Sequence, residues 1–195
     1  LVGVSITDST DFDLQALTLS GNLVVVSGGS ISQNVAAGGG ALTIGGTSSF
    51  ITSTTNKTIT LSDPTLTNAF TGAVTLNTTG SSGHAEVDGG TTKLDIAASS
   101  VGGNLTLTAG NVLGITNDSG IMTVGGDLTA TTDANSGVIN MLNLAVDGSI
   151  SLTTNGTGDA TIINDAGLDF AASTIGGDLT ATATTGNISD SGTIT

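Results

Sequence analysis

The sequence predicts an all-β protein that winds as a parallel β-solenoid, and three observations carry this prediction. A short pattern, apolar-x-Gly-x-apolar-x-apolar, recurs seven times along the 195 residues. A longer phrase, Leu94–Thr108, returns at 168–182 with ten of its fifteen positions identical. No stretch keeps a helical periodicity over three turns. A strand that recurs in this way can stack on its own copies and bury a continuous core, as solenoid repeats do.

Each copy of the short pattern is anchored on one glycine, and the spacing of these glycines sets the predicted coil length. Successive anchors lie 22 to 31 residues apart, which predicts about 22–31 residues per coil and roughly seven to eight coils. Because strand side chains alternate between two faces, each anchor falls on the inward, apolar face. A glycine at an inward position predicts a corner, where a Cβ atom would collide with the interior. The predicted structural corner glycines are Gly21, Gly46, Gly72, Gly103, Gly126, Gly148 and Gly177.

The same alternation assigns the side chains that follow each anchor. In the fourth copy, Leu105 and Leu107 point inward and Thr106 points outward, whereas the second copy departs from the apolar pattern once, at Ser48. If equivalent strands stack, the position after the anchor forms one polar column. We expect no acid in it to lie directly on another acid, because like charges one rung apart repel. That column reads Asn22, Thr47, Ala73, Asn104, Asp127, Ser149 and Asp178.

The repeats predict a single solenoid segment over residues 1–195, which we expect to be an internal fragment of a longer repeat protein. Landmarks that recur after 73 to 84 residues predict super-repeats at approximately 1–30, 31–114, 115–187 and 188–195, partial at both ends, with three coils in each full one. A string of immunoglobulin-like sandwiches is the alternative. It is disfavoured because a sandwich uses different strands at different places and a large buried aromatic residue, whereas here one strand recurs in every coil.

The composition bounds both the core and the partners. The chain has 30 Gly, one Pro, no Cys, no Trp, no Tyr and four Phe, so the core is built from Val, Ile, Leu and Ala without disulfide bonds. Two Lys, no Arg and 16 acidic residues give a net charge of −14, which disfavours nucleic acid as a partner. No apolar run reaches the length of a membrane span, so none is predicted.

Three segments carry a family resemblance: Val-Gly-Gly-Asn-Leu-Thr-Leu-Thr-Ala at 101–109, Ile-Ser-Asp-Ser-Gly-Thr-Ile-Thr at 188–195, and Asn-Ala-Phe-Thr-Gly-Ala-Val-Thr-Leu at 68–76. Together they resemble the repeats of filamentous-haemagglutinin-like exoproteins, giant bacterial adhesins of which many are exported by two-partner secretion. The resemblance implies a right-handed parallel β-helix, an extracellular location on the bacterial cell surface, and a structural role in adhesion, a biofilm or an extracellular filament. It implies neighbouring repeats of the same chain or fibre as partners, and host-cell or biofilm carbohydrate or protein as ligands.

No catalytic residue is predicted. His84 is the only histidine, and Ser81, Ser82 and Glu86 lie near it in sequence, but the local Gly and Ser content indicates a loop. A carbohydrate-active β-helix is the less favoured alternative, because such enzymes need clustered acidic or basic residues and often aromatic side chains that stack on sugars. The chain has no Arg, Trp or Tyr. We therefore expect a protein that is not an enzyme.

Acidic residues gather in two stretches that match no calcium motif. Neither fits the twelve-residue helical calcium loop or the Gly-Gly-x-Gly-x-Asp nonapeptide. We expect solvated loop acids and no cofactor, with loose binding of a divalent cation such as calcium as the alternative. The stretches contain Asp8, Asp11 and Asp13, and Asp159, Asp165 and Asp169.

Two further patterns concern the outer surface. Pairs of hydroxyl residues on successive coils predict an outward array of two columns, and regular Thr arrays on flat β-solenoids can bind ice, which gives an alternative function. The pairs are Thr106/Thr108, Thr129/Thr131, Ser151/Thr153 and Thr180/Thr182. Sequons for N-linked sugar occur at Asn56, Asn77, Asn104, Asn117, Asn155 and Asn187.

Overall fold

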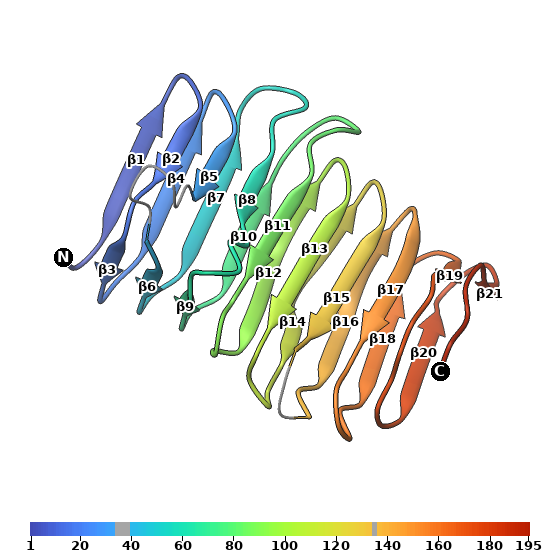
Figure 1. Ribbon diagram of the computed structural model, residues 1–195. Coiled ribbons are helices and arrows are strands. Elements are labelled where there is room, and N and C mark those ends of the chain that lie inside the picture. The colour runs from blue at the N-terminus through green and yellow to red at the C-terminus, as the bar shows by residue number, and fades with distance from the viewer. Residues whose placement is uncertain (34–39, 134–135) are drawn as a thin grey trace.

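The computed structural model describes residues 1–33, 40–133 and 136–195, and it confirms the all-β solenoid. The described residues form 21 strands and no helix, wound into about eight turns (Figure 1). Every strand lies parallel to its partners in the coils before and after it, so the backbone of one coil pairs with two neighbours. In the described part of the chain, no helix has the length and apolar character that crossing a membrane requires.

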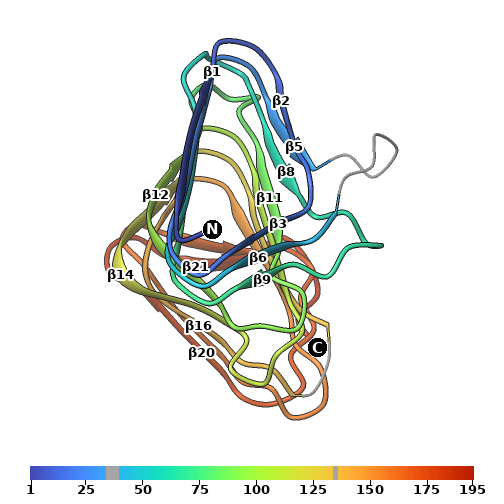
Figure 2. The ribbon, with the colours of Figure 1, turned by 90° about the vertical axis from the view of Figure 1, so that its left-hand side faces the viewer.

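Two nine-stranded sheets, A and B, run the length of the solenoid, and a three-stranded sheet C closes its first coils (Figure 2). Sheet A contains β1 (Val4–Asp8), β4 (Leu23–Ser27), β7 (Ser48–Thr52), β10 (Val74–Asn77), β12 (Leu94–Val101), β14 (Ile115–Val124), β16 (Ile139–Val146), β18 (Ala160–Asn164) and β20 (Leu179–Ala183). Sheet B contains β2 (Phe12–Leu14), β5 (Ile31–Gln33), β8 (Ile59–Leu61), β11 (Ala85–Asp88), β13 (Leu105–Ala109), β15 (Leu128–Thr132), β17 (Ser149–Thr153), β19 (Leu168–Phe170) and β21 (Ile188–Asp190). Sheet C contains β3 (Leu17–Leu19), β6 (Leu42–Ile44) and β9 (Ala69–Phe70).

The coil lengths overlap the predicted 22–31 residues, but their range begins and ends about three residues lower. Residues that stack directly are 19 apart from Val4 to Leu23, and 28 apart, the widest separation, from Ile31 to Ile59. Short strands joined by tight turns account for the small coils. The longest predicted step, 31 residues, is not one coil but a coil plus the distance to its next corner.

The expectation that all seven anchored strands stack on one another is wrong. The anchored pattern stays at one corner for three coils and then moves to a different corner of the coil. Each such move adds part of a coil to the spacing between glycines, which is why the spacings from Gly72 to Gly103 and from Gly148 to Gly177, 31 and 29 residues, exceed the longest coil. The anchored strands are β4, β7 and β10 in sheet A (after Gly21, Gly46 and Gly72), β13, β15 and β17 in sheet B (after Gly103, Gly126 and Gly148), and β20 in sheet A (after Gly177).

The long sequence phrase shows the same displacement. Its first copy begins with β12 in sheet A, whereas the equivalent residues 168–170 form β19 in sheet B. The 74-residue repeat is therefore not a whole number of coils, and the expected stack of three-coil super-repeats is not formed. One local sequence can build either corner because both corners require the same turn.

The longest strands of sheet A bend midway and so supply two sides of a coil. β12, β14 and β16 contain eight, ten and eight residues, and their pairing is irregular, as between Asn117 and Met122. Figure 2 shows the bend as a corner near the label of β14. These bent strands occupy the coils that follow the last strand of sheet C.

Inward side chains form one aliphatic core along the solenoid axis. The predicted direction is confirmed in β13, where Leu105 and Leu107 are fully buried and Thr106 is half-buried on the outer face. Each such buried side chain contributes about 1.5–3 kcal/mol. Two aromatic residues take part, because Phe50 and Phe70 meet edge to face with ring centroids 6.2 Å apart.

Candidate functional site

At the predicted corner glycines, the preceding coil closes the space that a side chain would need. A Cβ atom on Gly46 would lie 2.2 Å from Asn22 Oδ1 and 2.6 Å from the carbonyl carbon of Gly21. One on Gly126 would lie 2.2 Å from Asn104 Oδ1. The reason for glycine is therefore the stacking of turn on turn, and not the predicted collision with the interior. Contacts below 3.0 Å with the preceding coil would also form at Gly21, Gly72, Gly103, Gly148 and Gly177.

Beside these glycines, side-chain acceptors hold the backbone of the next coil. Asn104 Oδ1 accepts a hydrogen bond from the Asp127 N–H at 3.0 Å, and Asp127 Oδ1 accepts one from the Ser149 N–H at 2.8 Å. One coil earlier, His84 Nδ1 accepts the Asn104 N–H at 2.8 Å. We call His84, Asn104 and Asp127 the corner ladder. It ties four successive coils at a point where the strands of sheets A and B are interrupted.

The predicted single polar column is therefore divided between two corners. Asn22 Oδ1 accepts the Thr47 N–H at 2.9 Å, but this column belongs to the corner before sheet A. Directly before β20, the Asp178 N–H donates a hydrogen bond to Asp159 Oδ1 at 2.8 Å. Asp159 and Asp178 thus occupy adjacent rungs, against the expectation that no acid lies on an acid. Both are exposed, and water and salt screen the repulsion between them.

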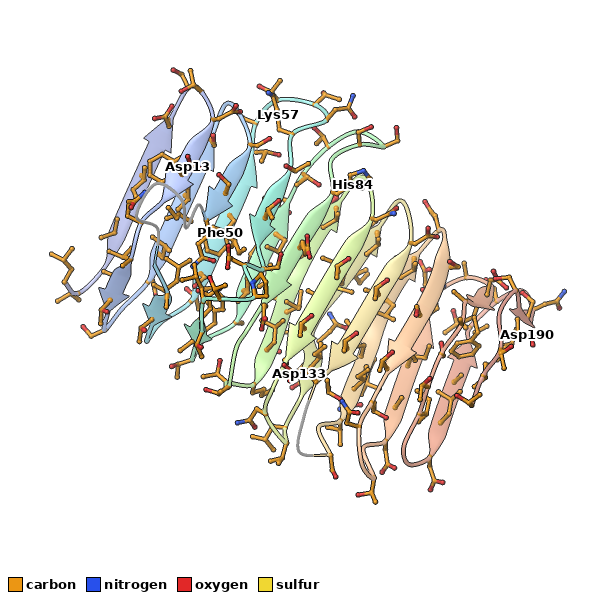
Figure 3. All side chains as sticks on the ribbon, viewed as in Figure 1. Asp13, Phe50, Lys57, His84, Asp133 and Asp190 are labelled. Atoms are coloured by element: carbon orange, nitrogen blue, oxygen red, sulfur yellow. The ribbon has the colours of Figure 1, made fainter. Side chains whose placement is uncertain are left out.

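Two corners of this kind escaped the sequence pattern. Gly83–His84 and Gly158–Asp159 are each followed by alternating apolar residues, but Ser81 and Gly156 stand where the pattern requires an apolar residue. A search for glycine, a polar residue and two alternating apolar residues would have found both. His84 lies in a turn at the upper edge of the solenoid (Figure 3). Its ring nitrogen is engaged with the next coil, so the structure gives it a place in the corner ladder.

The first predicted acidic stretch, Asp8, Asp11 and Asp13, makes separate local contacts. Hydrogen bonds from the Thr10 N–H at 2.7 Å and the Thr10 hydroxyl lower the pKa of Asp8. The pKa of Asp11 is lowered first by the Ser30 N–H, at 2.7 Å, and then by the charge of Lys57, whose Nζ lies 3.5 Å away. Asp13 accepts a hydrogen bond from the hydroxyl of its neighbour in β5. Asp11 and Asp13 thus fasten the first coil to later coils, whereas the bonds of Asp8 stay within its own turn.

The second predicted stretch, Asp159, Asp165 and Asp169, is also spread over different contacts. The Asp169 carboxylate accepts hydrogen bonds from the hydroxyls of Ser189 at 3.1 Å and Ser191 at 2.7 Å. Asp159 belongs to the column described above, and Asp165 lies in an exposed turn. Within residues 1–33, 40–133 and 136–195, no three His, Asp or Glu side chains are grouped closely enough to hold a metal ion.

The structure brings Asp88 and Asp133 to one shallow groove, a pairing that the sequence did not predict. The groove has a volume of about 270 Å³ and is also lined by Pro64. Burial raises the pKa of Asp88, the Gly90 N–H at 2.7 Å from its Oδ1 opposes this rise, and the charge of Asp133 adds to it. Figure 3 shows Asp133 in the lower half of the solenoid. The two acids stand 45 positions apart, so no local pattern marks them.

Hydroxyl side chains stack in register over three coils on the outer face of sheet B. Rungs in such a sheet are about 4.8 Å apart. Glu86 and Asp88 of β11 lie beside the first rung. Thr180 and Thr182, predicted as a further pair, belong to β20 of sheet A and lie outside this array. The hydroxyl array consists of Thr106, Thr129 and Ser151 in one column and Thr108, Thr131 and Thr153 in the other.

The sequons differ in access. Asn117 is fully buried, and its Nδ2 donates to the Gly120 carbonyl at 3.0 Å, so this amide is closed to a sugar. Asn77 is half-buried, and its Oδ1 accepts the N–H of Ser100 at 3.1 Å. The exposed sequons are Asn56, Asn104, Asn155 and Asn187.

The stacked coils, corner ladders and aliphatic core define the chain as a β-solenoid repeat protein. Its repeats follow a described family: residues 3–77 and 157–195 match the model of the repeats of unknown function (DUF5649). Because the match covers more than half of the chain, the protein belongs to that family. Comparison with curated proteins found no match, and comparison with solved structures found none.

Proposed function

We propose that this solenoid is a structural and adhesive segment of an extracellular bacterial surface fibre, of the filamentous-haemagglutinin-like kind. The observation that carries the proposal is the unbroken coil-to-coil pairing of sheets A and B, nine strands each, over one continuous core. A rod built in this way resists bending and extension, because any opening must break backbone hydrogen bonds and expose core residues together.

The side chains at the corners support the same role. The corner ladder and the closely packed glycines fasten turns to turns, so the rod is held at its corners as well as through its sheets. The outer face of sheet B offers hydroxyl groups that can bond carbohydrate, and the net charge of −14 keeps single rods soluble. We propose host-cell or biofilm carbohydrate or protein as the ligand, and neighbouring repeats as the structural partner.

Immunogold electron microscopy of intact source cells tests this proposal. Antibodies against residues 1–195 should label extracellular filaments, and protease added outside the cells should remove the label. Deletion of the segment should reduce attachment of the cells to a surface. Label confined to the cell interior would refute the proposal.

The hydroxyl array supports ice binding as a second candidate function. Its six side chains repeat at the rung spacing on one parallel sheet, which is a requirement for matching an ordered lattice of water. Thermal hysteresis of the purified chain measures this activity. We expect Thr129→Val, at the centre of the array, to change the thermal hysteresis while leaving the fold intact. If the purified chain shows no thermal hysteresis, ice binding is eliminated as a function.

A further inference from the structure

An exposed apolar groove lies along the bend of sheet A. It has a volume of about 220 Å³ and is lined by Ile121 of β14, Leu142 of β16 and Ile163 of β18. Ile121 is 61% exposed and Leu142 is 37% exposed. Asp165 and Thr184 line the same groove. We call it the bend groove; it differs from the hydroxyl-rich outer face of sheet B.

A second apolar feature protrudes from the turn immediately before β14. Val112 and Leu113 are 55% and 59% exposed. The Asn111 side chain fixes this turn, because its Oδ1 accepts the Leu113 N–H at 2.9 Å and its Nδ2 donates to the Thr91 carbonyl at 3.1 Å. Lys93 lies beside Leu113 in a shallow depression of the surface. We call Val112–Leu113 the apolar turn.

One molecule cannot bring these two features together. Leu113 lies in the turn before β14, whereas Ile121 lies eight residues later within the same strand, so β14 fixes them at separate places. Their flanking charges are opposite, with Asp165 at the bend groove and Lys93 at the apolar turn. We propose that the apolar turn of one molecule docks into the bend groove of a second copy, with Lys93 facing the partner's Asp165.

The contact joins two different surfaces, so each molecule can bind one copy through its groove and another through its turn. Such heterologous contacts extend side by side and do not stop at a dimer. Lys93 Nζ lies 3.5 Å from the exposed Asp118 carboxylate, a weak surface pair that leaves the lysine able to turn toward a second acid. This docking rests on the proposed fibre function, because aligned fibres supply the high local concentration that a small contact needs.

The contact is small and opposed by charge, which predicts how it responds to salt. A few side chains bury less than the about 800 Å² per partner of a standard interface, so the association is weak. Two molecules of net charge −14 repel each other, and salt screens that repulsion. We therefore expect association to strengthen from low to high salt, opposite to an interface held by ion pairs.

Sedimentation equilibrium of residues 1–195 over a range of concentrations tests the proposal. The chain should associate with increasing concentration, and Leu142→Asp or Leu113→Asp should each lower the association constant about tenfold or more, because each places a charge in an apolar contact. Val24→Asp is the matched control, since Val24 is a half-buried outward residue of β4 that belongs to neither feature. This control should associate as the original chain does. A chain that stays monomeric at every concentration and salt level would overturn the proposal.

Mixing the variants tests which surfaces meet. Leu142→Asp keeps a functional turn and Leu113→Asp keeps a functional groove, so an equimolar mixture should form heterodimers at concentrations where each variant alone is mostly monomeric. If one of these variants fails to fold, substitutions of Lys93 and Asp165 test the same docking. Lys93→Glu should weaken association, and Asp165→Lys should weaken it too although that change reduces the net charge of −14 by two and so the general repulsion. The double variant restores the net charge of −14 and should recover association. Association that survives these changes, or that the double variant does not recover, would overturn this docking mode.

Discussion

The first three coils and the later coils build the same solenoid with different corners. In β1 to β9, each coil has three separate strands, and a glycine turn separates sheet C from sheet A. In β12, β14 and β16, the glycine turn has moved to the corner between sheets A and B, and each strand bends where its pairing is irregular. A glycine turn at a corner thus ends a strand, whereas a bend leaves its strand continuous, even in β14, where Gly120 lies within the bend with a φ of 95°. The bend is also where apolar side chains reach the surface, as at Ile121.

The largest expected effect comes from filling a corner in either region. Gly46→Val in the three-sheet region and Gly126→Val in the two-sheet region should each lower the free energy of unfolding by at least about 3 kcal/mol, because each side chain would overlap the coil before it. Thermal and urea unfolding measure the loss. Thr129→Val, three residues after the second corner and on the outer face, is the control and should be nearly neutral. Equal losses would show that one turn serves both corners; a tolerated Gly126→Val would contradict this.

Replacing a buried amide side chain should lower the free energy of unfolding in both regions, by a smaller amount than filling a corner. Asn68 is 1% exposed; its Oδ1 accepts the Leu42 N–H at 2.9 Å and its Nδ2 donates to the Leu61 carbonyl at 3.2 Å. It also pairs with the Gln33 side chain and the Asp88 carbonyl. Asn164 in the later coils has fewer partners: its Oδ1 accepts the Val146 N–H at 2.9 Å, and its Nδ2 donates to the carbonyls of Val146 at 3.2 Å and Gly167 at 2.8 Å. Asn68→Ala should cost about 3 kcal/mol and Asn164→Ala about 2 kcal/mol, because each leaves buried backbone groups unpaired. Asn187→Ala, at an exposed position, is the control in urea unfolding, and a reversed order would contradict this reading of the two regions.

The repeat of the sequence was enough to predict stacking but not which strands stack. Alternation is local, so the inward direction of Leu105 and Leu107 could be predicted from neighbours in sequence. The coil length depends on the number of residues in each turn, and two glycine turns can lie at different corners of a coil. For the same reason, the ladder of His84 with Asn104 could not be predicted, since their register depends on intervening turns. The fold could be predicted from the periodicity of the sequence. The sites could not, because they depend on which residues of neighbouring coils lie opposite each other.

Ser48 offers a test in the three-sheet region, where a polar residue occupies an inward position. It is 1% exposed, stacks between Leu23 and Val74, and its hydroxyl has no hydrogen-bond partner among the described residues. Ser48→Ala should raise the free energy of unfolding by about 1 kcal/mol, because it removes a buried, unpaired hydroxyl. Thr52→Ala, which removes a buried hydroxyl that donates to the Lys57 carbonyl at 3.4 Å, is the control and should not stabilise. A destabilised Ser48→Ala chain would show that this hydroxyl is paired.

The smallest expected effect is the opposite pH dependence of two carboxyl groups, one in each region. Asp11 has its pKa lowered from 3.8, so its stabilising contribution is present above that value and is lost as the pH falls through the lower, folded value. Asp88 has its pKa raised from 3.8 by burial, so the folded chain holds its proton longer and stability falls as the pH rises through the raised value. Asp11→Asn should therefore lower the free energy of unfolding at pH 7, and Asp88→Asn should increase it.

Urea unfolding between pH 3 and pH 7 measures both differences, which should shrink toward the acidic end, where the carboxyl groups become protonated. Lys57→Gln is the matched control for the first coil. It should reproduce only part of the Asp11→Asn effect, because the Ser30 N–H is the larger cause of the lowered pKa. The charge of Asp133 should strengthen the Asp88 effect, so Asp133→Asn should reduce it. Changes of the same sign at Asp11 and Asp88 would mean that the groove does not bury its carboxyl group, and that the two regions present their acids to water alike.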